Sequence, residues 1–174
     1  MIDVGLVRHL DAAGIRFCLI GGIALAVHGI ARYTADVDLL TMDRRVLEPD
    51  FWAGTPVTDV RRGDLDDPLA GLVRWPGSPP HDLLVGRGHA MQLAVDTAEP
   101  NAALGCRVAT ALAFLLLKLE AGGPQDRWDV VSLVQAQRAL GRHAWLVEIP
   151  AHLPRLSPEA RACWARLECD LELA

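Results

Sequence analysis

The stretch CLIGGIALAVHGIARYTADVDLL, residues 18–40, decides the fold of this chain. It begins apolar, breaks at Gly21 and Gly22, and ends in Asp36 and Asp38. Carboxylates are rarely buried without a partner, so an apolar run that ends in two of them needs an explanation. The surrounding residues supply one.

A strand, a glycine turn, a short helix and a second strand follow one another in this region. Residues 15–20 are rich in β-branched and aromatic side chains, which predicts a strand. The pattern predicts a short helix over 23–29 and a second strand over 36–41. A strand that leads through Gly-Gly into a helix can bind a phosphate through backbone N–H groups, although the same pattern also occurs as a plain tight turn.

The two aspartates lie one residue apart, which places them on the same side of a strand. Like charges so close together are stable either in water, as two solvated acids at a strand end, or around a cation such as Mg²⁺. A third acid, Asp82, stands near the start of another apolar segment, 81–86. If that segment pairs with 36–41, three carboxylates converge, hold one or two Mg²⁺ ions, and provide a base for an attacking hydroxyl.

The rest of the chain extends this core. The link between the apolar segments 71–75 and 81–86 has hairpin length and predicts an antiparallel pair. We expect an α+β fold with a small mixed sheet of four or five strands, helices on one face, and C-terminal helices. Helices are predicted at 2–13, 88–98, 111–121, 125–140 and 157–173. In the fourth of these, Trp128, Val131, Leu133 and Val134 are expected to face the core.

The composition fits a globular domain. The chain has 174 residues, of which 51% are hydrophobic, and we expect a core at 1–104 with a helical extension at 105–174 packed on it as one compact unit. The net charge of −5 argues against a protein that coats nucleic acid by bulk charge. No apolar run reaches about 18 residues and no secretory signal is evident, so we expect a cytoplasmic protein with no membrane partner.

The glycine pair and the later acids resemble the nucleotidyltransferase superfamily, whose fold is that of the polymerase-beta palm. The variant with Arg-x-Thr before Asp-x-Asp looks most like the abortive-infection nucleotidyltransferase toxins and related minimal nucleotidyltransferases. The matching positions are Gly21, Gly22, Arg32, Thr34, Asp36, Asp38 and Asp82. A softer match covers Lys118, Asp126 and Asp129, so that the resemblance spans about residues 15–135.

The resemblance implies a reaction and a role for each residue. A nucleotide triphosphate such as ATP would bind through Gly21, Gly22, Arg32, Thr34 and Lys118. Asp36, Asp38 and Asp82 would be the catalytic and Mg²⁺-binding residues. A hydroxyl of RNA, protein or a small molecule would attack the α-phosphate and release pyrophosphate. The resemblance also implies a toxin with a cognate antitoxin; the alternatives are an antibiotic-type nucleotidyltransferase and a non-catalytic nucleotide-binding protein.

Several side chains keep two interpretations. Arg32 either meets a phosphate or pairs with the aspartates at 36 and 38. Lys118 either reaches the site or lies along the surface, while Asp129 is expected to pair with Lys118 or Arg127. His28 is interpreted as a packed histidine, and His81 is predicted to point to the strand face opposite Asp82.

Overall fold

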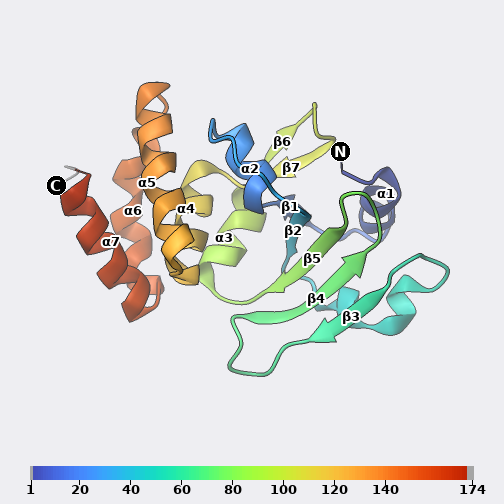
Figure 1. Cartoon of the computed structure of the whole chain (residues 1–174). Helices are drawn as coiled ribbons and strands as arrows, with labels where there is room; N and C mark the ends of the chain where they lie inside the picture. The colour runs from blue at the N-terminus through green and yellow to red at the C-terminus, as the bar shows by residue number, and fades with distance from the viewer. Residues whose placement is uncertain (1, 172–174) are drawn as a thin grey trace.

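The computed structural model describes residues 2–171, which form a seven-stranded mixed sheet with helices packed against it (Figure 1). The strands are β1 (Phe17–Leu19), β2 (Val37–Thr41), β3 (Asp59–Arg62), β4 (Leu69–Trp75), β5 (His81–Gly86), β6 (Glu99–Asn101) and β7 (Cys106–Val108). The α-helices are α1 (Val4–Ala12), α2 (Gly21–Val27), α3 (His89–Thr97), α4 (Ala111–Ala121), α5 (Pro124–Ala139), α6 (Ile149–His152) and α7 (Pro158–Asp170). Short 3₁₀ turns occupy Arg44–Leu47, Pro49–Trp52, Ala144–Glu148 and Leu153–Arg155. The predicted fold class is confirmed.

The sheet has the strand order β3-β4-β5-β2-β1-β7-β6. β2 runs parallel to β5 and β1 runs parallel to β7, whereas the other neighbouring pairs are antiparallel. The β4–β5 hairpin that the short link predicts is present. The two strands that carry the predicted acids therefore lie side by side at the centre of the sheet.

The two faces of the sheet bury different side chains. Cys18 and Leu40 pack on one face with alanines and a valine of α3 and α4. On the other face, the Asp3 backbone N–H donates to His81 Nε2 at 2.9 Å, and Trp75 contacts Trp52 with ring centroids 6.2 Å apart. Because neighbouring residues alternate between faces, His81 points away from the side of Asp82, as predicted.

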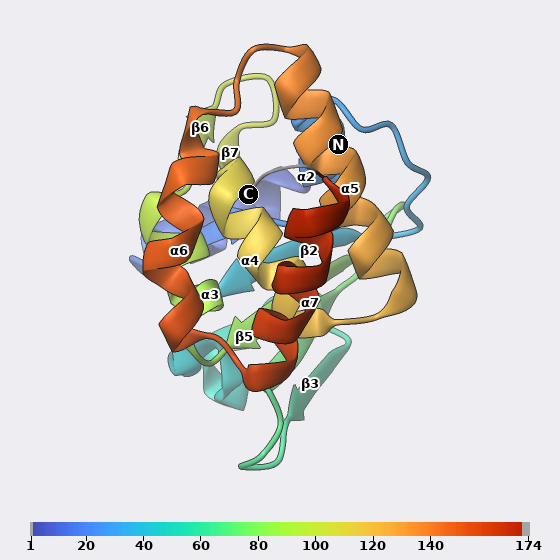
Figure 2. The same ribbon diagram turned by 90° about the vertical axis from the view of Figure 1, so that its left-hand side faces the viewer.

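The C-terminal helices gather at one end of the sheet, where α4 packs against α3, α5 and α7 (Figure 2). Two predicted caps are present: the Thr110 side chain accepts from the Ala113 backbone N–H, and Ser157 accepts from Ala160. α4 ends at Gly122, whose φ of 68° is left-handed, as expected for a glycine C-cap. Within the residues that the structure describes, no helix has the length and apolar character needed to span a membrane.

Two details differ from the prediction. The sheet has seven strands rather than four or five because β6 and β7 have three residues each, too few to show alternation. Trp128 does not face the core: it is 58% exposed, and Asp129 takes the inward position instead. A buried acid is admitted there because cations from two other elements meet it, as described below.

Candidate functional site

Three carboxylates converge at the start of the central strands. In the parallel β2–β5 pair, Asp38 lies directly opposite Asp82, and Asp36 immediately precedes β2. One carboxylate oxygen from each of the three lies within 4.8 Å of the others. Asp82 is buried, whereas the other two are partly exposed. The sequence places two of these acids near each other, and the strand register adds the third.

The cluster is electrostatically unfavourable without a cation. Burial first, and then the neighbouring charges of Asp36 and Asp82, raise the pKa of Asp38 to about 6, against a weaker opposite effect of Lys118 and Arg32. A carboxylate in this setting gains from any positive charge that enters the cluster. Three hard oxygen donors gathered at the ends of two neighbouring strands are a donor set suited to Mg²⁺.

Gly21 brings the start of α2 against the cluster. A Cβ atom at this position would lie 2.0 Å from Asp38 Oδ2, and its φ of +69° also favours glycine. A Cβ at Gly22 would lie 2.8 Å from Thr34 Cβ. The Thr34 hydroxyl donates to the Asp36 backbone oxygen at 3.0 Å, so it holds the turn that carries this acid. Both glycines are therefore required by close approach, and neither marks a free-standing turn.

Arg32 lies beside the site. Within residues 2–171, which the structure describes, it forms no ion pair with Asp36 or Asp38. Its guanidinium donates to Asp129 at 2.8 and 3.1 Å, and the Asp129 side chain has no exposed surface. Lys118 Nζ lies 2.9 Å from Asp129 and 2.7 Å from Asp126. The predicted Lys118–Asp129 pair is confirmed, and Lys118 is not a surface lysine, since its side chain is 17% exposed.

Sequence reasoning missed Arg74. Its Nε and one terminal nitrogen donate to the two oxygens of Asp82 at 2.8 and 2.6 Å, and this pairing raises the pKa of Arg74. The hairpin-length link predicts that the two strands pair, but the register that places Arg74 opposite Asp82 is seen only in the structure. The third acid of the cluster is thus held by an arginine from the neighbouring strand.

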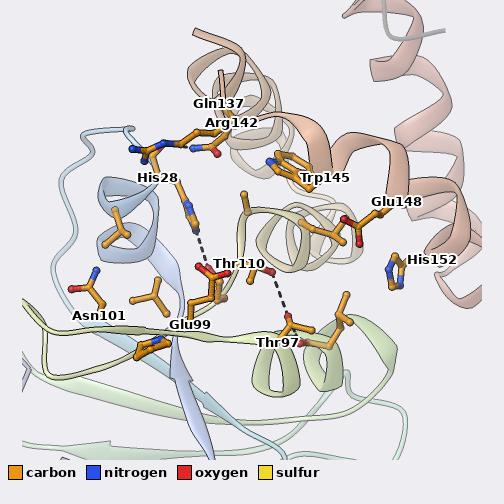
Figure 3. Close-up of a pocket in the computed structure, with 17 residues that line it drawn as sticks. His28, Thr97, Glu99, Asn101, Thr110, Gln137, Arg142, Trp145, Glu148 and His152 are labelled. Atoms are coloured by element: carbon orange, nitrogen blue, oxygen red, sulfur yellow. Dashed lines mark hydrogen bonds between the residues drawn. The ribbon is translucent and has the colours of Figure 1, made fainter. Parts of the chain in front are cut away.

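A cavity of about 680 Å³ lies elsewhere in the molecule, and none of the three acids lines it (Figure 3). It lies between the end of α2, the end of α5, and α6. His28 borders it and is a packed histidine, as predicted: its Nε2 lies 2.8 Å from the Ala109 carbonyl oxygen, and burial lowers its pKa. The acid cluster is a separate site.

Comparison with known proteins identifies the fold of this chain through solved structures. No family model matches the chain, and no curated protein matches it. Several solved structures are similar to this chain, and three of them match it along most of its length. The antibiotic-resistance factor ANT(2'')-Ia in solution has a TM-score of 0.50 at 18% identity, with 97% of this chain and 94% of that chain covered.

ANT(2'')-Ia in complex with adenylyl-2''-tobramycin has a TM-score of 0.52 at 15% identity, with 93% of this chain and 94% of that chain covered. An antigenic nucleotidyltransferase-like protein from Paracoccidioides brasiliensis has a TM-score of 0.50 at 19% identity, with 95% and 85% covered. This chain has a nucleotidyltransferase fold. At such identities the likeness concerns the fold, and the role of each residue of the acid cluster stays a prediction.

Proposed function

We propose that the protein is a Mg²⁺-dependent nucleotidyltransferase, which moves a nucleoside monophosphate from an NTP to a hydroxyl acceptor. The observation that carries this proposal is the convergence of Asp36, Asp38 and Asp82 within 4.8 Å. Gly21, the first residue of α2, has no side chain, so the Asp38 carboxylate can lie directly against the helix start. A misplaced third acid would have favoured a non-catalytic nucleotide-binding protein.

The three carboxylates would hold the metal. When bound, Mg²⁺ would neutralise charge on the nucleotide phosphates and orient the α-phosphate. Asp82 would accept the proton of the acceptor hydroxyl, whose oxygen bonds to the α-phosphorus as the bond to the bridging oxygen breaks and pyrophosphate leaves. Positioning and electrostatic stabilisation would supply most of the rate enhancement.

Gly21, Gly22, Thr34, Arg32 and Lys118 would act around this centre. The glycines would admit the phosphates, and the Thr34 hydroxyl keeps Asp36 oriented through the backbone bond at 3.0 Å. Arg32 and Lys118 would contribute positive potential from their fixed places on Asp129. Because both side chains are held in ion pairs, we propose that they act on the triphosphate through their charge and do not contact it directly.

Two acceptors are candidates. A small molecule is supported by the similar fold of ANT(2'')-Ia, solved with adenylyl-2''-tobramycin, and by the net charge of −5, which attracts cationic compounds. A toxin that modifies RNA or protein, with a cognate antitoxin, is supported by the sequence resemblance alone. We therefore propose the small-molecule acceptor as the first to test.

The test is transfer of label. The protein is incubated with Mg²⁺ and each α-labelled NTP, in parallel with a panel of aminoglycosides and with total RNA and cell extract. We expect label on an aminoglycoside. Label on a macromolecule would overturn the small-molecule acceptor but would support the proposed transfer reaction. The double variant Asp36→Asn/Asp38→Asn should transfer nothing.

The matched control is Asp96→Asn, which removes a surface acid paired with Arg16 and should transfer like the wild type. Nucleotide binding without transfer to any acceptor would favour the non-catalytic alternative. Absence of both nucleotide and metal binding in the wild type would overturn the proposed function.

A further inference from the structure

The Arg74–Asp82 pair uses the carboxylate that the proposed function gives to the metal. Both Asp82 oxygens accept a hydrogen bond from the Arg74 guanidinium, at 2.8 and 2.6 Å. This bidentate geometry is the strongest form of the pair. The strands β4 and β5 are neighbours in the sheet (Figure 1), and their register places the two residues opposite each other. The acid cluster thus already has a cation of its own.

That cation opposes a metal. A fixed positive charge on Asp82 reduces the attraction of the three carboxylates for a divalent ion and fills the lone pairs that face the guanidinium. The two partners differ in exposure: the Asp82 side chain is 11% exposed, whereas that of Arg74 is 46% exposed. The arginine can therefore leave toward solvent, while the acid stays in place.

The other cations near the cluster are not in this position. Arg32 and Lys118 are both tied to Asp129, which has no exposed surface and lies outside the cluster. Of these three cations, Arg74 alone is paired with an acid of the cluster itself. A guanidinium that has left a carboxylate matches phosphate oxygens with the same planar fork.

We propose that Arg74 competes with the divalent metal for Asp82, and that it exchanges this carboxylate for a nucleotide phosphate when the metal-bound nucleotide enters. This inference rests on the proposed function. It makes Arg74 a positioning residue that keeps Asp82 paired before the nucleotide binds and adds a phosphate contact afterwards. The exchange makes metal binding and nucleotide binding depend on Arg74 in opposite directions.

The variant Arg74→Gln tests the exchange. Binding of Mn²⁺ alone is measured by electron paramagnetic resonance, and binding of a non-hydrolysable NTP analogue is measured by calorimetry at saturating Mg²⁺. We expect Mn²⁺ to bind about tenfold tighter than in the wild type, since a charge-assisted competitor is gone. The analogue should bind about tenfold more weakly, since a phosphate contact is gone.

The matched control is Arg61→Gln, which removes an arginine of the adjacent strand β3 that pairs with Asp59 instead of a cluster acid. It should leave both affinities within about twofold of the wild type. A second variant, Arg74→Lys, keeps the charge and loses the fork. Its affinity for Mn²⁺ should stay close to that of the wild type, whereas its affinity for the analogue should fall part of the way toward that of Arg74→Gln. This variant tests the exchange even if the glutamine variant folds poorly.

The outcomes separate the two proposals. Unchanged or weaker Mn²⁺ binding in Arg74→Gln, with normal binding in the wild type, would overturn the exchange and leave the proposed function in place. The same conclusion follows if metal and nucleotide affinities shift in the same direction. If the wild type and both Arg74 variants bind neither Mn²⁺ nor the analogue, the proposed function fails and the exchange fails with it.

Discussion

At the scale of the residue, Gly21 has the tightest surroundings in the site. The hypothetical Cβ contact of 2.0 Å to Asp38 Oδ2 cannot be relieved without moving the acid, because Asp38 is fixed in β2. A positive φ adds a backbone cost. The sequence singled out this glycine because it follows a strand, and the expected reason was close approach of a phosphate. The structure gives a second reason, which is the close approach of the Asp38 carboxylate.

The substitution Gly21→Ala should displace Asp38 and weaken Mn²⁺ binding at least tenfold, with a loss of about 2 kcal/mol in the free energy of unfolding. Calorimetry and urea denaturation measure the two effects. Gly14→Ala is the control: Gly14 has a similar φ of +67°, but a Cβ atom there would have no neighbour within 4 Å. It should lose about 1 kcal/mol and keep metal binding. Equal metal affinity in both variants would contradict the role given to Gly21.

The raised pKa of Asp38 predicts that the free energy of unfolding depends on pH. This pKa is about 6 in the folded protein against 3.8 ordinarily, so between these values the folded state binds more protons than the unfolded state. Without metal, the free energy of unfolding should therefore fall as the pH rises from about 4 to 6. Asp38→Asn removes this dependence and should stabilise the protein at pH 8 by up to about 3 kcal/mol, with little effect at pH 4.

Urea denaturation in EDTA at pH 8 and pH 4 measures this difference. Metal binding should show the opposite trend, weakening as the pH falls below 6, because the metal needs the ionised carboxylate. Asp96→Asn, in an exposed pair, is the control and should show no comparable pH dependence. A less stable Asp38→Asn variant at pH 8 would contradict the electrostatic description of the cluster.

At the scale of the element, Asp129 joins three segments of the chain. It lies on α5, accepts from Arg32 in the loop before β2, and lies 2.9 Å from Lys118 on α4. This explains why α5 turns Trp128 outward: one face of the helix must present the acid. Hydrophobic periodicity placed Leu133 and Val134 in the core correctly but misplaced Trp128, since it treats a buried charge as polar and cannot detect cations that arrive from distant segments.

Replacing Asp129 should be costly. Asp129→Ala leaves two partly buried cations with fewer partners and should lower the free energy of unfolding by roughly 3 kcal/mol, as measured by urea denaturation. The control Asp96→Ala removes half of an exposed pair and should cost less than about 1 kcal/mol. Similar losses for the two variants would show that the buried ion pairs do not hold α4, α5 and the loop together.

At the scale of the whole molecule, the sheet and the helices depend on each other. The expected boundary between 104 and 105 falls in the β6–β7 hairpin, and β7 pairs with β1 next to the site. The core cluster includes side chains of α4, α5 and α7 together with those of the central strands. We retain the prediction that the chain is one compact unit.

A fragment of residues 1–104 tests this prediction. It lacks β7 and α4, so the edge of β1 and much apolar surface are exposed, and we expect no cooperative thermal transition by circular dichroism. The full chain, measured in parallel, should unfold in a single cooperative step. A fragment with native-like spectrum and a sharp transition would mean that the core folds independently of the helices.

The sequence by itself determined the strand–helix–strand unit around Gly21, the Asp36–Asp38 pair and the fold class, because these depend on local periodicity and on neighbours within one element. The sequence also offered Asp82 as a third acid and Lys118 as a partner of Asp129. Tertiary structure decided that Asp82 lies opposite Asp38, that Arg32 joins Lys118 on Asp129, and that Arg74 holds Asp82. The reason is physical: strand register and helix packing bring together charges that lie far apart along the chain, and their energies depend on distance and burial rather than on sequence spacing.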